Sequence, residues 1–149
     1  MIISLNDLRL VAYMAKTVAD LDLDDEHMTI GINDSVAEAA GRLLTMPGGI
    51  LIVLDDDSKA KGVIGHRQFL KALAANVDAS SSKCSEWMEM DFLDVQLSDS
   101  LKTVLSEIQK RGPQAVVASD TNGDFAGYFS PNDYQKAESL VRSLKDLKL

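Results

Sequence analysis

The sequence predicts an α+β fold built from two copies of one β-α-β-β-α unit. The first sign is a Gly-apolar-apolar pattern at Gly62–Gly65 that returns 65 positions later at Gly127–Ser130. With the same offset, residues 28–72 align with residues 93–137 without a gap. Both copies also contain alternating apolar stretches and helically spaced apolar stretches in the same order, which indicates matching strands and helices.

Each copy begins with a short strand and an amphipathic helix. Apolar residues alternate over residues 28–32 and 93–97, as in a half-buried strand. Ser35 and Ser100 then supply side-chain oxygens suited to a helix N-cap. The apolar faces predicted for the two helices consist of Val36, Ala39, Ala40, Leu43 and Leu44 in the first copy and Leu101, Val104, Leu105 and Ile108 in the second.

Two strands and a second helix complete each copy. In the first copy we predict a helix stop at Pro47–Gly49, a buried strand over 50–54, a polar turn from Asp55, a strand ending at Ile64 and a helix from His66. In the second copy the matching features are Gly112–Pro113, residues 115–118, a turn from Asp120, a strand ending at Phe129 and a helix from Pro131.

The segments outside the copies complete the domain organisation. Residues 5–19 have the apolar spacing of a helix, and the last helix runs from Pro131 towards Leu147, further than the repeat requires. We therefore predict an N-terminal helix (1–20), a first repeat (21–75), a polar linker (76–83) and a second repeat with an extended C-terminal helix (84–149).

Composition and charge exclude several classes of function. The net charge of −8 and the pI of about 4.6 disfavour nucleic-acid and anionic-membrane partners. No apolar run approaches the roughly 20 residues of a membrane span, and the N-terminus does not resemble a signal peptide, so we expect a cytoplasmic protein. Cys84, the single cysteine, is expected to fill apolar space, and Trp87, Met88 and Met90 are expected to pack.

The order of elements, repeated at a fixed offset, resembles a tandem pair of cystathionine-β-synthase (CBS) domains over roughly residues 18–140. The segment from Gly127 to Asp133 is similar to the Gly-apolar-apolar-Ser-x-x-Asp segment of that family. The resemblance implies two repeats related by pseudo-twofold symmetry, often dimerised, here in a homodimer. It also implies a non-catalytic module that senses AMP, ADP, ATP or S-adenosylmethionine and that acts on an enzyme or transporter.

The same resemblance implies a ligand site in the cleft of the second copy. Asp133 would accept hydrogen bonds from ribose hydroxyls, Ser130 would face ribose or phosphate, and Tyr128 would border the base or sugar. The cage around the base would come from the first copy: Met28, Thr29, Gly48, Gly49 and Ile50.

The cleft of the first copy departs from this pattern. Gly65 and Gln68 replace the hydroxyl and the carboxylate, so we expect weak binding there or none. The basic residue that many relatives place near Gln114 is also missing, which leaves Arg67 and Arg111 as possible phosphate contacts.

Two alternatives remain open from the residues themselves. The Ser130–Asp133 segment is also a good helix start that needs no ligand, because Ser suits the N-cap and an acid suits the third helical position. The chain could instead be a ligand-free association module that uses the spare apolar faces of its first and last helices. No catalytic or metal-binding constellation is present in the sequence; Asp55–Asp57 lacks the glycine and the twelfth-position ligand of a calcium loop.

Overall fold

The computed structural model describes residues 16–146, with side chains through residue 142. Most of the helix predicted for residues 1–20 therefore lies outside the described residues, and its last part is a 3-10 turn, η1 (Val18–Asp20). The first copy contains β1 (His27–Gly31), α2 (Val36–Leu44), β2 (Ile50–Leu54), β3 (Ala60–Ile64) and α3 (His66–Ala74). The second contains β4 (Phe92–Gln96), α5 (Leu101–Arg111), β5 (Ala115–Ser119), β6 (Phe125–Tyr128) and α6 (Pro131–Asp146).

The predicted β-α-β-β-α order is confirmed in both copies. The two sheets have strand orders β1-β2-β3 and β4-β5-β6. In each, the first two strands are parallel and the last two antiparallel, with matched registers such as Met28 with Leu51 and Leu93 with Val116. The C-terminal helix α6 has 16 residues against 9 for α3, as expected for an extended helix.

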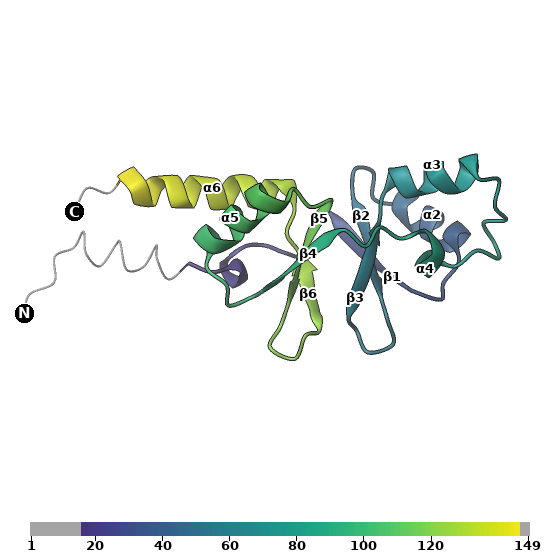
Figure 1. Ribbon diagram of the computed structural model, residues 1–149, viewed down its shortest axis with the longest axis horizontal. Coiled ribbons are helices and arrows are strands. Elements are labelled where there is room, and N and C mark those ends of the chain that lie inside the picture. Colours follow the sequence, from purple (N-terminus) through teal and green to yellow (C-terminus); the bar gives the residue numbers. More distant parts are fainter. Residues whose placement is uncertain (1–15, 147–149) are drawn as a thin grey trace, which may run out of the picture.

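The two sheets lie side by side at the centre of an elongated molecule, and the helices cover their outer sides (Figure 1). Between the sheets, buried residues of both copies form one apolar cluster: Ile52, Val63, Ala115 and Val117. The remaining core is divided between the copies, with one cluster under α2 and another under α5 and α6. The inter-sheet cluster thus holds the two halves together.

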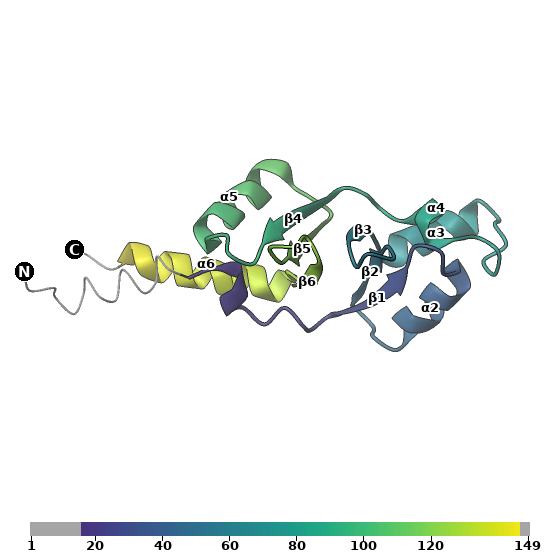
Figure 2. The ribbon, with the colours of Figure 1, turned by 90° about the horizontal axis from the view of Figure 1, so that it is seen from below.

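Each half also packs against the segment that precedes the other half's first strand (Figure 2). Val18 is fully buried in the core of the second copy, and the backbone N–H of Ala19 donates to Leu97 at 3.0 Å. Cys84, in the short helix α4 (Cys84–Trp87), is fully buried in the core of the first copy. A four-residue helix is too short to show periodicity in the sequence, so α4 was not predicted.

The repeated glycines Gly62 and Gly127 make these crossing contacts possible. A Cβ on Gly127 would lie 2.5 Å from Leu23 Cβ and 2.9 Å from the Leu23 carbonyl oxygen. A Cβ on Gly62 would lie 2.6 Å from Met88 Cγ. The Tyr128 N–H donates to the Leu23 carbonyl at 3.0 Å, so the absence of a side chain at Gly127 admits a close backbone approach.

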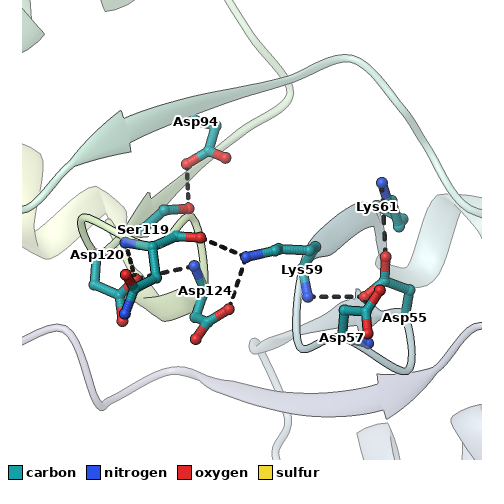
Figure 3. A network of polar contacts seen from close by, with 9 residues as sticks. Asp55, Asp57, Lys59, Lys61, Asp94, Ser119, Asp120 and Asp124 are labelled. Atoms are coloured by element: carbon teal, nitrogen blue, oxygen red, sulfur yellow. Dashed lines mark hydrogen bonds and ion pairs between the residues drawn. The ribbon is translucent and has the colours of Figure 1, made fainter.

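The Asp-rich turns of the two copies face each other (Figure 3). Asp55 Oδ1 accepts hydrogen bonds from two backbone N–H groups of its own turn, and Asp120 does the same in the other copy. Lys59 Nζ then reaches across to Asp124 Oδ1 at 2.8 Å. Lys59 and Asp124 are the same position of the two copies, so the pseudo-twofold arrangement brings them face to face.

Two packing predictions are wrong. Leu44, assigned to the apolar face of α2, is 80% exposed, because it lies about 100° around the helix axis from the buried Leu43. Met90, expected to pack, is 70% exposed, because the chain turns there and its carbonyl accepts from the Phe92 N–H. Met88, by contrast, packs against the core of the first copy.

Candidate functional site

The turn that begins α6 is tightly hydrogen-bonded. The N–H of Asp133 donates to Ser130 Oγ at 3.1 Å, which makes Ser130 the N-cap of the helix. In return, Asp133 Oδ2 accepts from the N–H and the hydroxyl of Ser130, each at 3.0 Å. This reciprocal capping box fixes the Asp133 side chain against the first turn of its own helix.

Asp133 is buried as well as capped. Both Asp133 and Ser130 are 1% exposed. Burial raises the pKa of the Asp133 carboxyl, the bonds from Ser130 oppose that rise, and the negative charge of Asp25 adds to it. Among the described residues, no lysine or arginine forms an ion pair with Asp133. The second copy therefore holds a carboxylate away from water without a bonded cation.

Tyr128 stands next to this turn at the end of β6. Its pKa is raised by burial, with smaller contributions from the charges of Glu26 and Asp133. The ring of His27 lies edge-on to it, with centroids 5.9 Å apart, and also edge-on to Phe125 at 5.5 Å. Three aromatic side chains from β1 and β6 thus meet, and one of them, Tyr128, lies near Asp133.

The residues predicted to cage a base approach this place to different degrees. Ile50 packs against the same inter-sheet cluster as Tyr128. Gly49 lies beside Glu26, since a Cβ on it would be 3.1 Å from the Glu26 carbonyl oxygen. Gly48 is exposed and has a positive φ of 83°.

The other two predicted cage residues have partners within the first copy. The Met28 side chain packs against the core of that copy and accepts a weak hydrogen bond from Thr45. The Thr29 carbonyl accepts from Arg42 at 2.6 Å. Of the eight predicted site residues, Tyr128, Ser130 and Asp133 form one group, and Ile50 packs against the same apolar cluster as Tyr128.

Sequence reasoning missed the side chains that face this group most closely. Glu26 Oε1 accepts from Asn132 Nδ2 at 2.7 Å, a contact between residues 106 positions apart. His27 supplies the ring against Tyr128. No local pattern reveals a contact of such separation, although both residues directly precede the first predicted cage position.

Two hollows flank the turn, and Asp133 lines neither of them. One, of about 180 Å³, is mostly apolar and includes Tyr128, Ser130 and Tyr134. The other is open, about 800 Å³, and lies between η1 and α6. It is lined by three aspartates, Asp20, Asp22 and Asp25, and by a single cation, Lys136. Ligand sites for drug-sized molecules usually measure about 300–1,000 Å³, so the smaller hollow alone is too tight for a nucleotide.

The first copy has the same turn without the charge. The N–H of Gly65 donates to Gln68 Oε1 at 2.8 Å, which matches the bond between Ser130 N–H and Asp133. Gln68 is 8% exposed and lines a hollow of about 190 Å³ together with Arg67 and, from the other copy, Gln114. Arg111, the other predicted phosphate contact, lies 3.8 Å from Asp91 instead.

Comparison with known proteins agrees with this geometry. Residues 18–75 match the model of the CBS domain family. No curated protein matches the chain. A CBS domain-containing protein from Bacillus anthracis has a similar structure, with a TM-score of 0.72 at 18% identity over 87% of this chain and 96% of that one.

The first repeat thus matches the CBS domain family, and the chain as a whole has the fold of a tandem CBS pair. Two other CBS pairs have the same fold. CBSX2 from Arabidopsis thaliana gives a TM-score of 0.69 at 17% identity, covering 87% of this chain and 98% of that one. The CBS domain pair of protein MJ0100, solved in complex with 5′-methylthioadenosine and S-adenosyl-L-methionine, gives 0.67 at 22% identity, covering 84% and 97%.

CBS pairs are generally regulatory modules. Within residues 16–146, no helix has the length and apolar character needed to cross a membrane.

Proposed function

We propose that this CBS pair is a non-catalytic sensor that binds one adenosine-containing ligand beside the Ser130–Asp133 turn and thereby regulates an enzyme or transporter. The candidates are AMP, ADP, ATP and S-adenosylmethionine. In this proposal Asp133 accepts the ribose hydroxyls, Ser130 supports it, and Tyr128 borders the base or sugar.

The observation that carries the proposal is the buried charge of Asp133. Removing a carboxylate from water costs free energy unless a cation or several donors compensate it. Capping does not require that charge, because neutral Gln68 makes the same bond to its N-cap residue in the first copy. Ribose binding would explain the charge, because an ionised carboxylate only accepts hydrogen bonds and can accept them from both hydroxyls of a diol.

The surroundings favour a ligand with little negative charge. The open hollow beside α6 has three aspartates and one lysine, so a polyphosphate entering there would meet net repulsion. S-adenosylmethionine, which is cationic at its sulfur, or a neutral adenosine compound fits this field better than ATP does. The net charge of −8 acts in the same direction.

Thermal denaturation with each ligand tests the proposal. A ligand at 100 times its Kd should stabilise the fold by about 2.7 kcal/mol, a rise of several degrees in Tm. Asp133→Asn should lose this rise, because the amide can still accept the capping bonds from Ser130 but presents a neutral group to the ribose. A response to S-adenosylmethionine that exceeds the response to ATP is expected.

Asp99→Asn is the matched control. Asp99 lies before α5 of the same copy, where its Oδ2 accepts from the Gln96 N–H at 2.9 Å, and it lines neither hollow beside Asp133. It should keep the full ligand response. A flat response of the wild-type protein to all four ligands, or an equal loss in both variants, argues against the site.

A second candidate function, homodimerisation, is favoured by exposed leucines on the first copy. Leu44, Leu70 and Leu73 are 80%, 65% and 77% exposed, on α2 and α3. At the same positions of the second copy the chain has polar residues: Gln109, Gln135 and Glu138. We propose that this apolar surface, rather than the terminal helices alone, contributes to self-association.

Sedimentation at several protein concentrations tests this second candidate. The double change Leu70→Glu and Leu73→Glu should shift the protein towards monomer, whereas Gln135→Glu on α6 should not. If wild type and both variants sediment as monomers at every concentration, the association proposal is rejected.

A further inference from the structure

The hollow beside the start of α3 is small and has several polar side chains in its wall. It measures about 190 Å³, and its polar wall consists of His66, Arg67, Gln68, Glu89 and, from the second copy, Gln114. Sites for drug-sized molecules usually measure about 300–1,000 Å³, so this hollow alone is too tight for a nucleotide. A small ion with a few heavy atoms is the size of ligand that it admits.

Gln68 presents a hydrogen-bond donor to this hollow. Its Oε1 accepts from the Gly65 N–H at 2.8 Å, and because an N–H only donates, the oxygen must be the end that faces Gly65. The other end, Nε2, forms no hydrogen bond with any described residue. Gln68 is only 8% exposed, yet every fully buried side-chain nitrogen or oxygen of the described residues has a partner. The unpaired Nε2 therefore keeps accessible surface, and the hollow is the space that Gln68 lines.

The equivalent side chain of the second copy has the opposite character. Asp133 accepts from Ser130 through Oδ2, and its other oxygen, Oδ1, is a further acceptor. In the first copy the corresponding atom is the Nε2 of Gln68, which only donates. A carboxylate suits a ligand that brings hydroxyl donors, whereas a carboxamide nitrogen suits a ligand that brings acceptor oxygens.

The start of α3 adds further donors. Its N-cap residue, Gly65, has no side chain to accept an N–H, and the N–H groups of His66 and Arg67 meet no acceptor within the described residues. Such N–H groups point back along the helix axis, here towards Gly65, which also lines the hollow. Free N–H groups at a helix start favour an anion. The second copy offers fewer, because Ser130 caps its helix and Pro131 has no N–H.

The charged side chains of the wall are one arginine and one glutamate. The Arg67 guanidinium is exposed and forms neither a hydrogen bond nor an ion pair with any described residue. Glu89 opposes an anion, but its Oε1 accepts from the Asp91 N–H at 2.9 Å, which holds that carboxylate in its own turn. The His66 ring and the Gln114 amide can each donate as well. Donors from both copies therefore outnumber the one acid of this wall.

We propose that the hollow at the start of α3 is a binding site for a small oxyanion of the size of phosphate. Gln68 Nε2 and the free N–H groups of the first turn donate to the oxygens of the ion, and the Arg67 guanidinium supplies the positive charge. The site is distinct from the proposed adenosine site at Asp133 and does not depend on it. The two copies then bind ligands of different chemistry, one through an acceptor and the other through donors.

Titration of inorganic phosphate into isotope-labelled protein, followed by amide NMR, tests the site. Sodium chloride at the same ionic strength is the reference, since it reproduces the screening of charges without the oxygens of phosphate. Saturable shifts with a millimolar Kd are expected for the backbone amides of His66 and Arg67 and for the side-chain amide of Gln68. Shifts that are absent, or that chloride reproduces, overturn the proposal.

Two variants remove different parts of the site. Gln68→Glu replaces the free donor by an acceptor and keeps the oxygen that binds the Gly65 N–H. Arg67→Gln removes the charge at an exposed position without a partner among the described residues, so it decides the question if Gln68→Glu does not fold. Each should weaken phosphate binding about 10-fold or more, because a hydrogen bond to a charged group is lost.

Arg111→Gln is the matched control. It removes the same charge from another exposed arginine, which lies 3.8 Å from Asp91 and does not line the hollow. Its Kd for phosphate should equal that of the wild type. Equal losses in Arg67→Gln and Arg111→Gln overturn the site, because net charge alone would then explain the binding.

AMP and the Asp133→Asn variant separate this site from the proposed adenosine site. A response of the same amides to phosphate but not to AMP identifies a free ion, and a response to both shows that a phosphate monoester also enters. A response to AMP alone, or a loss of phosphate binding in Asp133→Asn, overturns the proposal. If phosphate binds here while no adenosine compound binds to the protein, the proposed function fails and this site stands.

Discussion

The turns that begin α3 and α6 make the same backbone bond but differ in charge and in their relation to the adjacent hollows. In the first, Gln68 accepts from Gly65 and lines a hollow; in the second, Asp133 accepts from Ser130 and lines neither adjacent hollow. Both lie at the start of a helix that follows the last strand of a three-stranded sheet. The comparison separates the capping bond, which both copies make, from the negative charge, which only the second copy has at this position.

Folding needs a side chain that returns to the N-cap residue, and a neutral amide meets that need. The carboxylate adds a desolvation cost to the apo protein that the two hydrogen bonds from Ser130 offset only in part, since its pKa remains raised. Groups that lower stability without a structural return are found most often where a protein binds something. The two copies of one chain thus act as each other's control, and the following changes exploit this.

The largest effect is expected at the repeated glycines. Gly127→Ala should destabilise the fold by about 2–4 kcal/mol, because the new Cβ meets both Leu23 Cβ and the Leu23 carbonyl that Tyr128 binds. Gly62→Ala should cost less, about 1–3 kcal/mol, since the three atoms nearest to its Cβ all belong to the Met88 side chain and none is backbone. Urea denaturation of both variants measures the difference.

Second substitutions at the contacting residues test the Gly62→Ala and Gly127→Ala variants further. Met88→Ala should recover part of the loss in Gly62→Ala, because it removes the Cγ and Sδ atoms at 2.6 and 2.7 Å and leaves only the Met88 Cβ, at 2.8 Å, of the three nearest atoms. Leu23→Ala should recover little in Gly127→Ala, because the backbone oxygen and the Cβ remain. Equal rescue in both copies would show that the two crossing segments are held in the same way.

The sequence predicted the repeats well, because strand alternation, Ser35 and Ser100 as caps, and the glycine stops are all local signals. It could not predict the exchange of segments between the halves. The contact of Leu23 with Gly127 and that of Glu26 with Asn132 join residues about a hundred positions apart and leave no periodic trace. For the site, the sequence indicates a capping box at Ser130, whereas the 1% exposure of Asp133 depends on tertiary packing that no local pattern reveals.

The next effect concerns the buried charge itself. Gln68→Glu should destabilise the first copy by about 1–3 kcal/mol at neutral pH, because it places a charge where the fold has an amide. Asp133→Asn should do the reverse and stabilise the ligand-free protein by on the order of 1 kcal/mol. Denaturation curves at neutral pH show both signs.

The pH dependence of Asp133→Asn follows from the raised pKa of Asp133. Since the folded-state pKa lies above the ordinary 3.8, the native protein takes up this proton before the unfolded chain does. The cost of the charge is therefore present above the folded pKa and disappears as pH falls through it towards 3.8. The stability advantage of the variant should shrink over that range; an advantage that grows on acidification contradicts the assignment.

A smaller effect is expected at Cys84, the counterpart of Val18 in the crossing segments. Burial raises the pKa of the Cys84 thiol to about 11, so little thiolate exists at neutral pH. Thiol reagents should label Cys84 in the native protein only as fast as local or global unfolding exposes it. Cys84→Val should change stability by less than about 1 kcal/mol, because valine fills the matching place in the second copy. Rapid labelling of the native protein contradicts this packing.

The smallest effect is expected where the two copies meet, at Lys59 and Asp124. The hydrogen bond with Asp124 raises the pKa of Lys59, so the contribution of the pair is complete below about 10.5 and is lost as pH rises through the folded value. The two side chains are 35% and 42% exposed, so solvent and salt screen them.

Charge reversal shows whether this pair holds the halves in register. Lys59→Glu places like charges at matching positions of the two copies and should lower Tm slightly at low salt, with the loss fading in high salt. Adding Asp124→Lys restores opposite charges and should restore Tm. If the double change is no better than Lys59→Glu alone, the apolar cluster between the sheets suffices to align them, and the ion pair follows from the symmetry without contributing to it.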